Sequence, residues 1–146
     1  MKEMQTVALR FAENFAPEGG TIRAHQKVID DAGYVWYGKL GAPVSSIVVS
    51  EILMQQDPRI QLIHSGGYDR WWAHIDEIKR ETPEAAAIPA YYRDKASDYH
   101  CWFKVVRFER AEKDVMSRCF VSSSGTALTE ASRHSMSPSF IIEYEG

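Results

Sequence analysis

The chain has 146 residues, of which 45% are apolar and 25% charged, the composition of one globular domain with a sizeable core. Its net charge of −3 argues against a protein that coats nucleic acid non-specifically, because proteins of that class depend on many Lys and Arg contacts to phosphate. The charge is uneven, however: residues 59–118 carry a net +1 and the remainder −4, which leaves room for a local basic face.

The first part of the chain predicts a strand, a helix and a second strand. Residues 6–12 (TVALRFA) place apolar side chains on one face at a period of two, as in a half-buried strand. Residues 21–33 repeat apolar side chains at helical spacing, with Thr21 as candidate N-cap and Gly33 as the C-terminal stop. Residues 34–40 (YVWYGKL) then predict a strand.

The middle of the chain contains one ambiguous segment and a predicted hairpin. Residues 44–56 fit either structure, since Pro43 suits a helix start whereas the β-branched residues within the segment suit a strand. Residues 59–65 and 69–78 predict two strands, and the Gly-Gly pair between them suits a hairpin turn.

An irregular segment, residues 81–99, follows the hairpin and is long enough to predict a lid or binding loop. Within it, we expect residues 88–99 (IPAYYRDKASDY) to form a mobile loop that orders over the ligand. Residues 101–110 predict a strand, 112–120 a short helix, 122–139 a Ser-rich loop and 140–144 a closing strand. This order predicts an α+β fold. We expect a curved, mixed, mainly antiparallel sheet or a small pseudo-barrel with flanking helices.

Two segments carry a resemblance to a known family. IQLIHSGGYDRWWAHIDEI and CWFKVVRFERAEKDVMSRC resemble the core of PUA-like domains, particularly the EVE and YTH branches, over about residues 34–120. The resemblance implies a single PUA-like, EVE-type domain over residues 1–146. It also implies binding of nucleic acid, because EVE and YTH domains hold an extruded base in an aromatic pocket. The chain lacks the full set of cage tryptophans of YTH domains, which argues against methyladenine recognition in particular.

Aromatic residues are the main candidates for contacts to a base, because each ring that stacks on an unstacked base contributes about 1–3 kcal/mol. Core packing is the competing interpretation for each of them. Successive residues of a strand point to opposite faces, so Trp71 and Trp72 cannot both be core residues of a one-sided sheet. We expect the pocket to lie between the strand near Trp36 and residues 71–102. The candidate ligand-binding residues are Trp36, Tyr37, His64, Ser65, Trp71, Trp72, Tyr92 and Trp102.

Three cations on the strand 101–110 are candidates for phosphate contacts: Lys104, Arg107 and Arg110. Strict alternation places Lys104, Phe108 and Arg110 on one face of that strand, with Arg107 on the other. Solvated strand ends are the alternative interpretation of these charges.

Other chemistries leave no signature in the sequence. The histidines lack metal-ligand spacing and the chain has no P-loop or G-x-G-x-x-G, so neither a metal nor a cofactor is predicted. A G-x-S-x-G elbow is absent, and the Ser-rich segment around His134 is therefore interpreted as a polar loop. Without a signal region, a membrane span or a C-x-x-C motif, we expect a cytoplasmic protein whose Cys101 and Cys119 stay reduced.

The predicted function is that of a non-catalytic nucleic-acid binding domain that reads a modified or flipped base in an aromatic pocket. The alternative is a protein that binds a free nucleotide or a similar planar small molecule, which fits the acidic net charge better. A hydrolytic enzyme ranks third.

Overall fold

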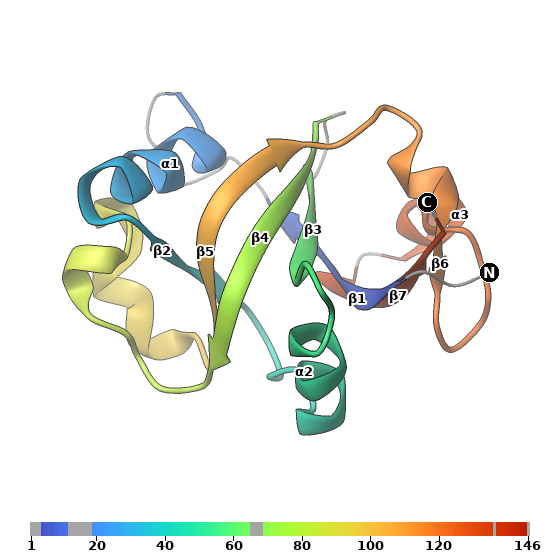
Figure 1. Ribbon diagram of the computed structural model, residues 1–146, viewed down its shortest axis with the longest axis horizontal. Helices are drawn as coiled ribbons and strands as arrows, with labels where there is room; N and C mark the ends of the chain where they lie inside the picture. Colours follow the sequence, from blue (N-terminus) through green and yellow to red (C-terminus); the bar gives the residue numbers. More distant parts are fainter. Residues whose placement is uncertain (1–3, 12–18, 65–68, 136, 146) are drawn as a thin grey trace.

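The computed structural model describes residues 4–11, 19–64, 69–135 and 137–145. They contain seven strands: β1 (Met4–Phe11), β2 (Val35–Lys39), β3 (Arg59–His64), β4 (Arg70–Lys79), β5 (Cys101–Arg110), β6 (Cys119–Val121) and β7 (Ser139–Tyr144). All seven belong to one sheet in the order β2-β5-β4-β3-β1-β7-β6 (Figure 1). Only β1 and β3 are parallel neighbours, so the predicted mixed, mainly antiparallel α+β fold is confirmed. The strands β2 and β6 form the two edges of the sheet. Within the described part of the chain they do not pair with each other, so the sheet is open.

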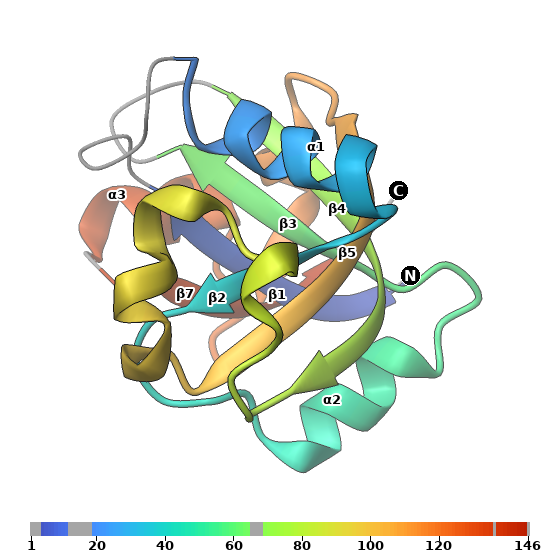
Figure 2. The same ribbon diagram turned by 90° about the vertical axis from the view of Figure 1, so that its left-hand side faces the viewer.

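Three α-helices and three 3₁₀ helices accompany the sheet: α1 (Thr21–Ala32), α2 (Ser46–Leu53), α3 (Leu128–His134), η1 (Ala85–Ala87), η2 (Ala90–Asp98) and η3 (Val115–Arg118). Helix α1 contacts β2 and β5, while α2 contacts β1 and β4. Figure 2 shows α1 above β2, α2 below the sheet, and the yellow segment of η2 in front of β2. Helix α3 lies at the opposite end of the molecule, beside β6 (Figure 1).

Helix α1 is capped at its C-terminus and helix α2 at its N-terminus. Helix α1 ends as predicted at Gly33, whose φ of 88° is left-handed and whose N–H donates to the Ile29 carbonyl at 2.7 Å. Its N-cap is Gly20 rather than the predicted Thr21. The ambiguous segment is a helix, because the Ser45 hydroxyl caps α2 by accepting from the Val48 N–H at 3.3 Å.

Both faces of the sheet are buried, so the rule that a one-sided sheet cannot bury both Trp71 and Trp72 does not apply. The central core lies on one face under α1 and α2, and contains Val7, Leu9, Phe11, Val35, Tyr37, Ile52, Ile60, Leu62, Ile75, Phe103 and Val105. The second core lies on the other face and contains Met4, Ala8, Ile63, Trp72, Val115, Met116, Cys119, Leu128 and Ile142. Trp72 is only 4% exposed in the second core, while Trp71 packs against the central core. Two adjacent tryptophans thus pack on opposite faces without either needing a ligand.

The segment expected to be a lid consists of η1, η2 and their connections. It covers part of β2 and β5 and forms a third group of buried residues, the Trp102 cluster, with Trp36, Ala87, Ile88, Tyr92, Ala96 and Trp102. Trp102 is fully buried there, and its ring stacks on that of Tyr92 with centroids 6.2 Å apart. The mobility predicted for residues 88–99 stays a prediction, but η2 lies within them and has regular structure, with Tyr92 and Ala96 buried.

A bulge breaks the alternation of β5. The register between β4 and β5 shifts on either side of Ile75, because His74 faces Arg107 whereas Ile75 faces Val105. As a result Val105 and Phe108 both contact the central core, and Val106 is 38% exposed. The predicted face shared by Lys104 and Phe108 is therefore wrong beyond Val106.

The C-terminal part of the chain differs from the prediction at two places. Residues predicted as a short α-helix at 112–120 form η3 and the first residues of β6. The segment interpreted as a Ser-rich loop contains α3, which is anchored by the fully buried Leu128.

Cys101 and Cys119 are both buried and form no disulfide, and burial raises the pKa of the Cys119 thiol to about 12. None of the helices in the described residues is both long and apolar enough to span a membrane.

Candidate functional site

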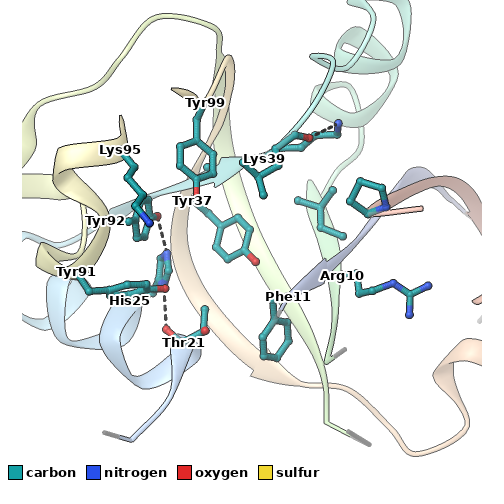
Figure 3. Close-up of a pocket in the computed structure, with 14 residues that line it drawn as sticks. Arg10, Phe11, Thr21, His25, Tyr37, Lys39, Tyr91, Tyr92, Lys95 and Tyr99 are labelled. Carbon is teal, nitrogen blue, oxygen red and sulfur yellow. Dashed lines mark hydrogen bonds between the residues drawn. The ribbon is translucent and has the colours of Figure 1, made fainter. Parts of the chain in front are cut away.

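A cavity of about 410 Å³ opens between α1, η2 and the sheet, and we call it the aromatic cavity. Ligand pockets in proteins start at about 300 Å³, so this volume suits a small planar ligand. Strands β1 and β2, helix α1 and helix η2 each supply part of the wall. Figure 3 shows Tyr91, Tyr92 and Lys95 on one side of the cavity and Arg10 on the other. The lining residues are Leu9, Arg10, Phe11, Thr21, His25, Tyr37, Gly38, Lys39, Leu40, Tyr91, Tyr92, Lys95, Tyr99 and Pro138.

The missing side chain of Gly38 lets η2 approach β2 closely. A Cβ atom at this position would lie 2.8 Å from Cδ1 of Tyr99 and 3.1 Å from Cζ3 of Trp102. Tyr99 therefore packs directly on the backbone of β2, with its ring centroid 5.5 Å from those of both Tyr92 and Trp102. This packing holds the tyrosines of η2 against the strand that carries Tyr37.

A buried hydrogen-bond chain fixes the floor of the aromatic cavity. His25 Nδ1 lies 2.8 Å from the Thr21 carbonyl, which can only accept, so this nitrogen carries the proton. Burial lowers the pKa of His25 from 6.5 to about 4, and the ring is neutral near pH 7. Its Nε2 then accepts from the Tyr92 hydroxyl at 2.9 Å. The Tyr92 pKa is raised well above its ordinary value, chiefly by burial, so this hydroxyl keeps its proton.

Arg10 supplies a positive charge at one side of the aromatic cavity. Its guanidinium donates to the main-chain carbonyls of residues 132, 135 and 137 at 3.1–3.3 Å. Within the described ranges, no carboxylate forms an ion pair with it. These carbonyls orient the guanidinium but leave its charge without a counter-ion from the described side chains.

Lys39 is a second cation in the wall and is only 9% exposed. Its ammonium donates to the carbonyls of Leu40 at 3.2 Å and Ala42 at 2.6 Å, and burial lowers its pKa. Lys95 from η2 is a third. The lining residues that the structure describes include no Asp or Glu, so the cavity concentrates positive charge in a protein of net charge −3.

The structure distributes the described members of the predicted ligand-binding set over three environments. Tyr37 and Tyr92 line the aromatic cavity. His64 and Trp71 line a neighbouring cavity. Trp36, Trp72 and Trp102 are at most 4% exposed and line neither cavity, whereas Ser65 lies outside the described residues. The cavity thus adjoins β2, as expected, but tyrosines rather than tryptophans form its walls.

Each predicted phosphate contact already faces a carboxylate. The ion-pair distances are 3.8 Å from Lys104 Nζ to Asp76, 3.9 Å from an Arg107 nitrogen to Glu109, and 3.1 Å from an Arg110 nitrogen to Asp69. Lys104 also lies 4.7 Å from the centre of the Tyr34 ring. None of the three lines the aromatic cavity.

Sequence reasoning missed His25, Phe11, Tyr91, Tyr99 and the three lining cations. His25 lies on the apolar face of α1, where the sequence pattern predicts a core residue. Arg10 and Lys39 lie in strands, and no binding motif surrounds them. Tyr91 and Tyr99 belonged to the segment expected to close over a ligand, and that expectation was the one signal that pointed to them.

The fold and the cavity together define an α+β domain with a tyrosine-lined, positively charged pocket beside its edge strand β2. A family model described as Pua-like matches residues 7–142, nearly the whole chain. The chain therefore belongs to the Pua-like family, and the predicted PUA-like resemblance is confirmed at that level. No curated protein and no solved structure gives a significant match.

Proposed function

We propose that this protein is a nucleic-acid binding domain that holds a flipped, modified base in the aromatic cavity, without catalysis. One observation carries the proposal: the same cavity combines aromatic walls with three lining cations and no described carboxylate. Aromatic faces hold an extruded base by stacking, and the cations suit the phosphates on either side of it.

The family supports the class of ligand. Pua-like domains generally bind RNA or other nucleic acids. The WFKV strand and the hairpin before it resemble the EVE and YTH branches in particular, in which an extruded base enters an aromatic pocket. In this chain the pocket residues we assign to base stacking are Tyr37, Tyr91 and Tyr99, with Arg10 and Lys95 at its two sides for phosphate.

A free planar small molecule is the second candidate. It is favoured because the three cations predicted to contact phosphate are each paired with a carboxylate. Lys104, Arg107 and Arg110 are each paired with a carboxylate, so they add little net positive field for a long backbone. A mononucleotide would need only the cations of the cavity itself.

Fluorescence anisotropy can separate the two candidates. Labelled single strands and duplexes, each with one modified or unmodified base at the centre, are titrated with the protein at low and moderate salt. Free nucleosides and nucleotides carrying the same bases serve as competitors. A nucleic-acid reader is expected to prefer the strands and to lose affinity with rising salt. Equal affinity for the free nucleotide, with little dependence on strand length, would instead support the small-molecule candidate.

Tyr91→Ala is the variant that ties binding to the aromatic cavity. Loss of one stacking face is expected to weaken binding by about 1–3 kcal/mol. Tyr34→Ala is the matched control, because Tyr34 is also a half-buried tyrosine but lies outside the cavity. Equal effects of the two variants on affinity would contradict the assignment of this cavity.

A further inference from the structure

A second cavity of about 430 Å³ adjoins the aromatic cavity, and we call it the Trp71 cavity. The two share Phe11 and Thr21 as lining residues, so they lie side by side. The rest of its described wall comes from α1 and the glycines before it, from the ends of β3, β4 and β5, and from Asp69. Two groups bound in the two cavities would therefore be neighbours.

Two pairs of stacked planar groups line this space. The Arg110 guanidinium lies over the Trp71 ring, 4.6 Å from its centre, and Trp71 is half-buried with its other contacts in the central core. The His64 ring stacks on Phe11 with centroids 5.1 Å apart and an interplanar angle of 17°. Indole and guanidinium planes are surfaces on which bases stack without sequence preference.

The charges of the Trp71 cavity suit a phosphodiester. Arg23 and Arg110 contribute two positive charges and Asp69 one negative charge among its described lining residues. The Arg110–Asp69 pair has a separation of 3.1 Å, but its side chains are 63% and 54% exposed. Because such exposed ion pairs contribute little to stability, a phosphate can replace the carboxylate at small cost.

We propose that the Trp71 cavity is a second subsite, which takes the nucleotide next to the one held in the aromatic cavity and stacks its base on the Arg110 guanidinium that the Trp71 ring supports. The inference rests on the proposed function, since it needs a nucleic acid as ligand. It assigns a role to Trp71, His64 and Arg110 that differs from reading the flipped base: they recognise the strand beside it. The domain then requires at least two consecutive nucleotides for full affinity.

The test uses two labelled trinucleotides that carry the same central base and the same phosphates. In one of them both flanking positions are abasic, so only the flanking bases differ. Wild-type protein is expected to bind the intact trinucleotide about tenfold more tightly, as loss of one stacked base predicts. Trp71→Leu is expected to bind both equally, whereas Trp71→Phe keeps a ring and keeps most of the preference. Thermal unfolding of each variant checks that the fold is retained.

The outcomes separate this inference from the function on which it rests. If wild-type protein binds both trinucleotides equally and Tyr91→Ala weakens both, the second subsite is refuted and the base pocket survives. If Trp71→Leu retains the wild-type preference for intact flanks, another surface contacts the flanking base, which also refutes it. Failure of every strand to bind wild-type protein would overturn both proposals together.

Discussion

Replacing His25 tests whether a neutral, buried imidazole supports the wall of the aromatic cavity. Burial lowers the pKa of this group from 6.5 to about 4. Between these two pH values, His25 is protonated in the unfolded chain but not in the folded protein. The free energy of unfolding therefore falls as the pH falls. With 1.36 kcal/mol for each pH unit, His25 alone should remove about 3 kcal/mol of stability between about pH 7 and pH 4.

The assay is urea unfolding of wild-type protein and of His25→Gln at several pH values across that interval, followed by tryptophan fluorescence. Glutamine keeps polar atoms at the site but does not titrate. The variant is expected to be less stable than wild type at neutral pH, and the difference in the free energy of unfolding should shrink by about 3 kcal/mol as the pH approaches 4. Subtraction of the two profiles removes the contribution of all other titrating groups.

A control at an exposed histidine sharpens the comparison. The side chain of His134 on α3 is 77% exposed, so comparison of His134→Gln with His25→Gln separates the effect of burial from that of replacing a histidine by glutamine. A gap between wild type and His25→Gln that stays constant within about 1 kcal/mol from pH 7 to pH 4 would refute the reasoning. So would a gap that widens as the pH falls, because that sign requires a raised rather than a lowered pKa.

Three further substitutions probe the core, the packing of η2 and the charge of the cavity. Trp72→Ala should lower the free energy of unfolding by about 3–5 kcal/mol and leave affinity for a labelled strand unchanged, measured by urea unfolding and anisotropy. Gly38→Ala should displace Tyr99 from β2 and weaken the binding of a labelled strand while the protein still unfolds cooperatively. Unchanged affinity would mean that Tyr99 contacts no ligand. Arg10→Gln should weaken binding of every sequence alike and reduce the salt slope by about one, whereas Arg107→Gln should change it less, and the reverse order would restore the phosphate contacts predicted on β5.

Much of the sheet could be predicted because its strands carry local signals. Period-two apolar patterns mark β1 and β3, and the hydrophobic face of α1 ends at a glycine that takes the left-handed conformation. The helix α3 gave no such signal, since its seven residues lie in a serine-rich context and depend on a single buried anchor, Leu128. Propensity is too weak to compete with tertiary packing over so short a segment.

The site was harder to predict, because burial of an aromatic residue depends on what covers it. Trp36 and Trp102 lie at strand positions from which an exposed ring could contact a ligand. Because η1 and η2 cover them, both are instead part of the core. The bulge beside Val106 moves Phe108 to the other face, and a single sequence without its partner strand contains no sign of that register shift. Length alone predicts residues 81–99 to be a lid or binding loop, but it cannot indicate which of their tyrosines face the cavity.

The position of β1 also has a consequence for biosynthesis. Ala8 of β1 faces Gln61 of β3 on one side and Phe140 of β7 on the other, so β1 obtains its β7 partner only after the other described strands have been synthesised. Until then an apolar strand keeps an unpaired edge, and such edges invite intermolecular pairing. Long-range pairing of this kind also slows folding. Nascent chains that stop short of β7 are therefore the species that we expect chaperones and proteases to engage.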